Sequence, residues 1–171
     1  MIRCFEKILR TGTLTEPVPA PEKEIAQLGA AFKQEIAARF RGSLAIRMVD
    51  AGSCNGCELE MHALNNPFYD IERFGIHFVA SPRHADLLLV TGVVSRHMQA
   101  ALIRTYQATP SPKLVVAMGD CAANGGEFGA SYASCGPVAN VIPVDMTIPG
   151  CPPTPLVLLQ GLLQLLHRKF R

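Results

Sequence analysis

Gly52-Ser53-Cys54-Asn55-Gly56-Cys57 is the stretch around which the rest of the chain is organised. It follows a hydrophobic run, Leu44 to Val49, that has the composition of a buried β-strand. Two more cysteines, Cys121 and Cys151, stand in the same position directly after later hydrophobic runs. Because the carboxyl ends of parallel strands meet at one edge of a sheet, we predict that these four thiols converge there.

Hydrophobic runs alternate with helical patterns along the chain, which is typical of a parallel α/β sheet. We predict strands at Leu44 to Val49, Ile76 to Ala80, Asp86 to Val90, Leu114 to Met118 and Val141 to Ile148. Helices are predicted at 22–41, around 59–64, around 98–106 and from Pro155 through Leu166. Leucines surround much of the last helix, so we expect its own sheet and a neighbour to bury it. The fold class is therefore α/β, a flavodoxin-like three-layer fold with a mainly parallel sheet.

Four cysteines at one edge of a sheet are typical of a bound metal centre. Cys54 and Cys57 form one local pair, whereas Cys121 and Cys151 stand alone and far along the chain. This spacing favours an iron–sulfur cluster assembled by the whole fold, with four thiolates for either a [4Fe-4S] or a [2Fe-2S] cluster. Structural zinc and buried or redox-active thiols remain open as alternatives. Neither Cys4 nor Cys135 follows a strand in this way, and we predict that both are free thiols.

The length of 171 residues suits one domain. We expect a single α/β iron–sulfur domain over residues 22–171 and an N-terminal arm over residues 1–21. In the arm, Met1 to Arg10 predicts a short amphipathic helix on a partner or a membrane surface, or else a terminus that only a partner orders. The segment Gly12 to Pro21 predicts a proline-rich linker.

Charge and hydropathy exclude several classes of function. Sixteen Lys and Arg against fourteen Asp and Glu leave the chain almost balanced, which argues against a nucleic-acid partner. No apolar stretch reaches the roughly 18 residues that a transmembrane helix needs. Charged residues at Arg3, Glu6, Lys7 and Arg10 argue against a secretory signal, so we expect a cytoplasmic location, where cysteines serve as ligands or free thiols.

The motifs around these cysteines resemble a known family. The segments that carry the resemblance are Cys54-Asn55-Gly56-Cys57-Glu58-Leu59-Glu60, Ser81-Pro82-Arg83-His84-Ala85-Asp86 leading into Leu87 to Gly92, Gly119-Asp120-Cys121, Ile142-Pro143-Val144-Asp145, and Pro149-Gly150-Cys151-Pro152-Pro153-Thr154-Pro155. They are similar to the small subunit of membrane-bound, energy-converting (group 4) [NiFe] hydrogenases such as formate hydrogenlyase and CO-induced hydrogenase. That family is homologous to the 20 kDa (B) subunit of respiratory complex I.

The resemblance implies one [4Fe-4S] cluster on Cys54, Cys57, Cys121 and Cys151, and no catalytic residue in this chain. It implies electron transfer between a ferredoxin-like iron–sulfur subunit and a [NiFe]-hydrogenase-like large subunit, in a complex that reduces protons or oxidises hydrogen. The complex would be docked on ion-translocating membrane subunits, with this chain peripheral on the cytoplasmic side. The alternatives are a B-type subunit of a complex I-like quinone oxidoreductase, a hydrogenase-related complex without nickel, or a zinc-stabilised structural subunit.

Three further residues lie in the matched motifs. Glu60 matches an acidic position of the family and either helps to move protons near the cluster or is an ordinary exposed or paired carboxylate. Arg83 and His84 lie between two predicted strands. They would either place a positive or titrating group near the cluster or anchor their loop.

Overall fold

A computed structural model describes residues 2–11 and 23–169 of the chain. The helices are α1 (Ile2–Thr11), α2 (Lys23–Arg39), α3 (Gly56–Ala63), α4 (Arg96–Ala108), α5 (Asp120–Asn124) and α6 (Pro155–Lys169). The strands are β1 (Leu44–Asp50), β2 (Ile76–Phe78), β3 (Leu87–Thr91), β4 (Leu114–Met118) and β5 (Met146–Ile148). Three short 3-10 helices, η1 (Ile71–Phe74), η2 (Pro82–His84) and η3 (Val138–Asn140), complete these elements.

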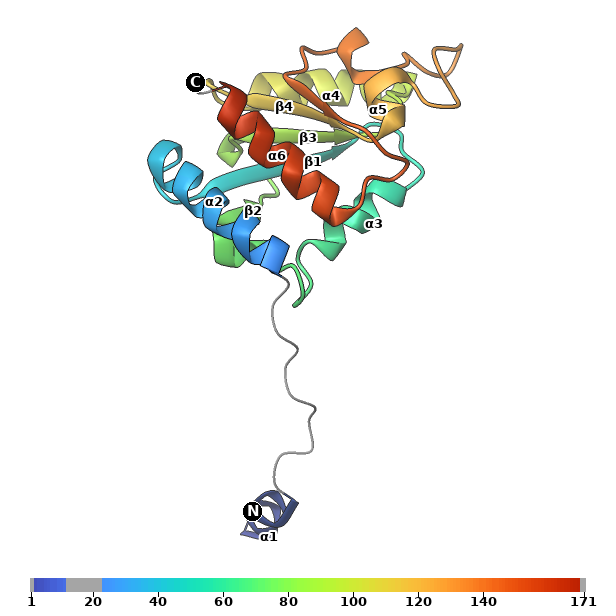
Figure 1. Cartoon of the computed structure of the whole chain (residues 1–171). Coiled ribbons are helices and arrows are strands. Elements are labelled where there is room, and N and C mark those ends of the chain that lie inside the picture. The colour runs from blue at the N-terminus through green and yellow to red at the C-terminus, as the bar shows by residue number, and fades with distance from the viewer. Residues whose placement is uncertain (1, 12–22, 170–171) are drawn as a thin grey trace.

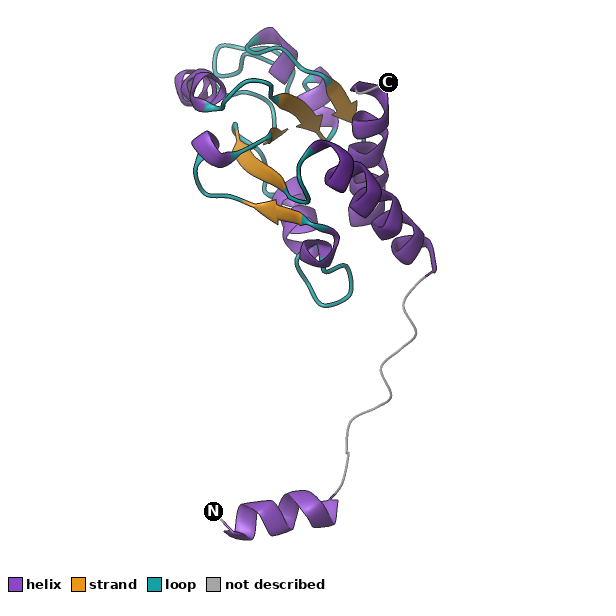
Figure 2. Ribbon diagram, turned by 90° about the vertical axis from the view of Figure 1, so that its left-hand side faces the viewer, coloured by secondary structure: helices purple, strands orange, loops and turns teal. Residues whose placement is uncertain are grey.

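The strands form one five-stranded parallel sheet in the order β2-β1-β3-β4-β5. This order is that of flavodoxin-like folds, and it confirms the predicted fold class. α2 and α6 cover one face of the sheet and α4 lies on the other, which gives the three layers seen in Figures 1 and 2. β3 and β4 are buried along their whole length because both of their faces are covered.

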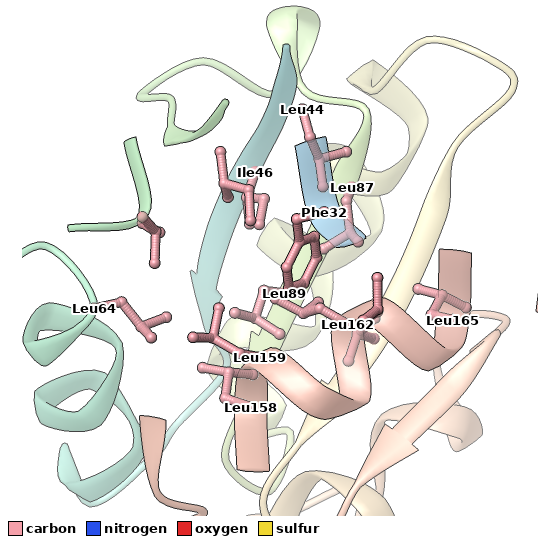
Figure 3. Packing of buried hydrophobic residues seen from close by; sticks show 14 of the residues in the cluster. Phe32, Leu44, Ile46, Leu64, Leu87, Leu89, Leu158, Leu159, Leu162 and Leu165 are labelled. Atoms are coloured by element: carbon pink, nitrogen blue, oxygen red, sulfur yellow. The ribbon is translucent and has the colours of Figure 1, made fainter. Parts of the chain in front are cut away.

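The larger core lies between the sheet and the α2–α6 layer. Phe32 of α2 packs there with leucines of the strands and of α6, as the close view in Figure 3 shows. The predicted double burial of α6 is explained inside the chain, because α6 contacts both the sheet and α2. Alternate residues of the central strands, such as Leu88 and Val90, point to the smaller core on the α4 side.

Two of the predicted strands are longer than the observed ones. β5 covers only Met146–Ile148 of the predicted Val141 to Ile148, and β2 ends at Phe78 instead of Ala80. Pro143 has no backbone N–H to give to a ladder, and the Oδ2 atom of Asp145 accepts the N–H of Val115 at 2.8 Å. The carboxylate of Asp145 therefore accepts the N–H of Val115, where the predicted strand would place a backbone carbonyl. α5 was not predicted.

The N-terminal arm is described in part. The predicted helix is present as α1, and its apolar residues Phe5, Ile8 and Leu9 are exposed. The predicted linker Gly12 to Pro21, and with it the boundary at residues 21–22, lies outside the described residues. None of the helices within residues 2–11 and 23–169 is both long and apolar enough to cross a bilayer.

Candidate functional site

The carboxyl ends of four strands stand in one row. Asp50 of β1 pairs with Thr91 of β3, Thr91 with Met118 of β4, and Met118 with Ile148 of β5. The loops that leave β1, β4 and β5 at this row carry all four of the cysteines predicted to converge. β3 carries none, and its exit at Gly92 and Val93 lies between the others.

The first two cysteines are held by a turn that begins at Asp50. The Oδ1 atom of Asp50 accepts the N–H groups of Gly52 and Ser53, both at 2.8 Å, and so fixes the chain direction before Cys54. The Oγ atom of Ser53 then accepts the N–H of Asn55 at 3.1 Å. α3 begins at the next residue, which puts Cys57 in its first turn.

The other two cysteines lie on loops that bond to each other. Cys121 is in the first turn of α5, and the N–H of Asp120 donates to the carbonyl of Gly150 at 2.9 Å. In return, the Oδ1 atom of Asp120 accepts the N–H of Gly150 at 2.8 Å. This reciprocal pair places the residue before Cys121 against the residue before Cys151.

One cavity of about 100 Å³ is lined by Cys54, Cys57, Cys121 and Cys151. Phe128, Pro152 and the exit of β3 form other parts of its wall. Cys54 and Cys151 are exposed at its rim, whereas Cys57 and Cys121 are half-buried.

Glycines make room for two of the sulfurs. A Cβ atom added to Gly119 would lie 2.7 Å from the Sγ of Cys57, and one added to Gly126 would lie 2.7 Å from the Sγ of Cys121. Both glycines also have a positive φ, 86° and 51°, which side chains rarely adopt. Any other residue at these two positions would push against a thiol of the cavity.

Burial raises the pKa of two of these thiols, Cys57 and Cys121. Burial raises the pKa of Cys57 to about 12, and the negative charges of Glu58 and of the other three cysteines add to this effect. Burial also raises the pKa of Cys121, with further contributions from Cys151, Cys54 and nearby carboxylates. Four thiolates at this edge need a cation among them, and bound iron deprotonates coordinating thiols.

The donor set suits an iron–sulfur cluster. Four cysteine thiolates around one cavity are the ligands that such clusters take. Within residues 2–11 and 23–169, no group of three His, Cys, Asp or Glu side chains lies close enough together to bind a single metal ion. In a four-iron cluster each thiolate binds a different iron atom, so the four sulfurs need not meet at one point.

Glu58 is a buried acid that the sequence analysis did not single out. It follows Cys57, is only 4% exposed, and accepts a hydrogen bond from the hydroxyl of Thr91 through its Oε1 atom. Its Oε2 atom is buried without a hydrogen-bond partner. Glu60, which was singled out, is half-buried. Both acids belong to the same motif, and nothing in the sequence distinguishes the buried one.

The remaining candidate residues lie away from the cavity. Arg83 and His84 belong to η2, which precedes the amino end of β3. The cysteines lie at the carboxyl ends of the strands, so the predicted position of Arg83 and His84 near the cluster is wrong. The Oγ atom of Ser81 accepts the N–H of Arg83, which fits a loop-anchoring role. Cys135 is a free thiol packed against the smaller core, as predicted. The side chain of Cys4 lies outside the part that the structure describes.

Comparisons with known proteins identify the family of the chain. Residues 54–165 match the family described as NADH ubiquinone oxidoreductase, 20 Kd subunit. The chain is 43% identical over 145 residues to formate hydrogenlyase subunit 7 of Escherichia coli, which covers 85% of this chain and 56% of that protein. It is also 43% identical over 148 residues to the probable membrane-bound hydrogenase subunit mbhJ of Pyrococcus furiosus, which covers 86% of this chain and 83% of that protein.

A solved structure has the same fold. A chain of the membrane-bound sulfane sulfur reductase, an archaeal respiratory membrane complex, superimposes with a TM-score of 0.64 at 35% identity. The match covers 86% of this chain and 78% of the other. The chain belongs to the family of the 20 kDa subunit of NADH ubiquinone oxidoreductase, as a subunit of the group 4 hydrogenase-like kind.

Proposed function

We propose that this chain binds one [4Fe-4S] cluster through Cys54, Cys57, Cys121 and Cys151 and carries electrons within a membrane-bound hydrogenase complex. One observation carries the proposal: cysteines from three separate loops line a single cavity, and glycines leave the space that two of their sulfurs occupy. The four thiols are the complete ligand set of such a cluster.

The residues of this chain would hold and tune the cluster. When bound, a cluster of this class takes up and releases single electrons at a potential set by charge, hydrogen bonds and exposure. Asp50 and Asp120 fix the loops that carry the ligands. Glu58 adds a buried acid beside one ligand, and Cys54 and Cys151 mark the exposed rim through which a partner approaches.

The similarity to hydrogenase subunits supports the choice of partners. We propose a [NiFe]-hydrogenase-like large subunit and a ferredoxin-like iron–sulfur subunit on either side of the electron path. Membrane subunits of the same complex would hold this chain as a peripheral component on the cytoplasmic side. The chain has no catalytic residue of its own in this proposal.

A complex I-like quinone oxidoreductase is the second candidate. The matched family takes its description from an enzyme that reduces ubiquinone. One matched structure is a chain of a membrane-bound sulfane sulfur reductase. In complex I subunits the first two cysteines are adjacent, whereas two residues separate Cys54 from Cys57, and this spacing favours the hydrogenase branch.

The test is metal analysis of protein purified without oxygen, together with its partners. We expect about four iron and four acid-labile sulfide per chain. We also expect a low-temperature EPR signal after reduction that disappears in Cys121→Ser and Cys151→Ser. Cys135→Ser is the matched control and should keep both the iron and the signal.

The other outcomes separate the alternatives. Nickel in the co-purified complex supports the hydrogenase, and its absence beside an intact cluster supports the quinone-type or nickel-free complex. Stoichiometric zinc without iron or a reducible chromophore would overturn electron transfer and leave a structural subunit.

A further inference from the structure

The exposed side of α1 is a feature that the cysteine site leaves unexplained. Phe5, Ile8 and Leu9 are 65%, 64% and 83% exposed, so three large apolar side chains of one short helix face water. At about 3.6 residues per turn these three fall on one side of the helix. Lys7 and Arg10 fall on the other.

A helix as short as α1 is stabilised when its apolar side packs against a surface. α1 has ten residues, and isolated helices shorter than about 12–15 residues are marginally stable in water. Burial of an apolar side is what stabilises such a helix, and residues 2–11 and 23–169 leave this side exposed. A surface beyond these described residues would have to cover it.

The charges of α1 indicate the kind of surface. The helix carries Arg3, Lys7 and Arg10 against the single acid Glu6. Basic residues on the polar side, with Phe and Leu on the other, are typical of helices that lie in the plane of a membrane interface. The positive excess complements the negative surface of anionic lipids.

We propose that α1 lies in the interface of an anionic lipid bilayer, with Phe5, Ile8 and Leu9 among the acyl chains and Lys7 and Arg10 at the headgroups. With ten residues, α1 is too short to span a bilayer. This inference does not depend on the cluster, because α1 carries none of the four proposed ligands.

The experiment measures sedimentation of the purified full-length chain with vesicles. Vesicles of phosphatidylcholine mixed with phosphatidylglycerol should carry the chain into the pellet, and pure phosphatidylcholine should carry less. The variant Phe5→Ser/Leu9→Ser should bind at least about tenfold more weakly. Lys7→Gln/Arg10→Gln should lose about fivefold per charge removed and most of the salt dependence.

Matched controls lie elsewhere on the surface. Phe68→Ser removes an aromatic side chain that is 53% exposed, and Lys23→Gln/Lys33→Gln removes two exposed charges of α2. Both should bind vesicles as the unaltered chain does. A chain that stays in the supernatant with both kinds of vesicle, as expected for a helix that fits a groove of a protein subunit, overturns the proposal. Equal losses in the control variants overturn it as well.

Discussion

Gly126 shows at the scale of one residue how closely the chain fits its cysteines. A Cβ at this position would meet the Sγ of Cys121 at 2.7 Å and the Cα of the same residue at 3.2 Å. Gly129 has a similar φ of 54° but no atom within 4 Å of the Cβ position. The two positions therefore share a positive φ and differ in the space around the Cβ position.

We predict that Gly126→Ala lowers the iron content per chain, because the added methyl group displaces the sulfur of Cys121, a proposed ligand. Gly129→Ala should cost about 1 kcal/mol of stability, as Gly126→Ala also does through its backbone, and should leave the iron content unchanged. Iron analysis and urea unfolding of both variants measure this difference. Equal iron in the two proteins would contradict the role given to Gly126.

The raised pKa of Cys57 predicts that the stability of the metal-free chain depends on pH. Its pKa is raised from 9.0 to about 12 by burial first and by neighbouring negative charges second. Above pH 9 the unfolded state loses this proton while the folded state keeps it, so stability should fall as the pH rises from 9 towards 12. The midpoint of urea unfolding, measured on both sides of pH 9, should fall less in Cys57→Ala than in the unaltered chain.

Substitutions of Glu58 and Thr91 should have coupled effects on the stability of the fold, because the two side chains share a hydrogen bond. Thr91→Val removes the one hydrogen bond to a buried carboxylate that already has an unpartnered oxygen, so we expect a loss of about 1–3 kcal/mol. Glu58→Met removes the acid itself. In a double-mutant cycle, the two substitutions together should cost less than the sum of the single ones, and additive losses would exclude the coupling.

At the scale of the elements, two aspartates begin strands in the same way. The N–H of Asp86 donates to the carbonyl of Ala45, and the Oδ2 atom of Asp86 accepts the N–H of Ala45 at 2.9 Å. Asp145 forms the same reciprocal pair with Val115 of β4. Each carboxylate occupies the backbone donor that would otherwise extend the ladder, and so sets where β3 or β5 begins.

Asp86→Ala should therefore destabilise the fold by about 1–3 kcal/mol, because it leaves the part-buried N–H of Ala45 without an acceptor. Asp86→Asn keeps an oxygen at the same place and should lose less than half of that amount. Urea unfolding of the two variants provides the comparison. A loss that is the same for both would show that charge, and not the accepted hydrogen bond, is what Asp86 contributes.

These aspartates also show what the sequence could and could not predict. The central strands were predicted closely because continuous runs such as Leu114 to Met118 have few other stable places than the middle of a parallel sheet. The start of β5 was not predicted, because the hydrophobic pattern does not show that the side chain of Asp145 takes the place of a backbone carbonyl as acceptor. α5 was missed because five residues carry no periodicity, and Glu58 because burial depends on Thr91, 33 residues away.

At the scale of the whole molecule, different contacts stabilise the sheet and the loops of the cysteine site. β3 and β4 are buried on both faces by cores that lie mostly away from the cavity, although Cys57 of the cavity packs against the larger one. The loops after β1, β4 and β5 have the cavity on one side, and part of their surface is exposed. Loss of the proposed cluster should therefore loosen the loops and leave the sheet intact.

Hydrogen exchange on cluster-loaded and metal-free protein would measure which parts of the backbone open more easily when the proposed cluster is lost. We expect faster exchange in residues 51–57, 119–129 and 149–153 of the metal-free chain, with unchanged protection in β3 and β4. Protection lost throughout the sheet would mean instead that the cluster holds the entire fold together.

The late position of β5 in the sequence sets the time at which the cysteine cavity is completed during synthesis. Cys54 and Cys57 leave the ribosome early, but the wall that carries Cys151 is positioned by β5 and by the bonds between Asp120 and Gly150. At about 5–20 residues per second, roughly 5–20 s separate the first cysteine from the last. A nascent chain thus presents an incomplete set of thiols for this interval, and the proposed cluster could be assembled only after nearly all of the chain has been made.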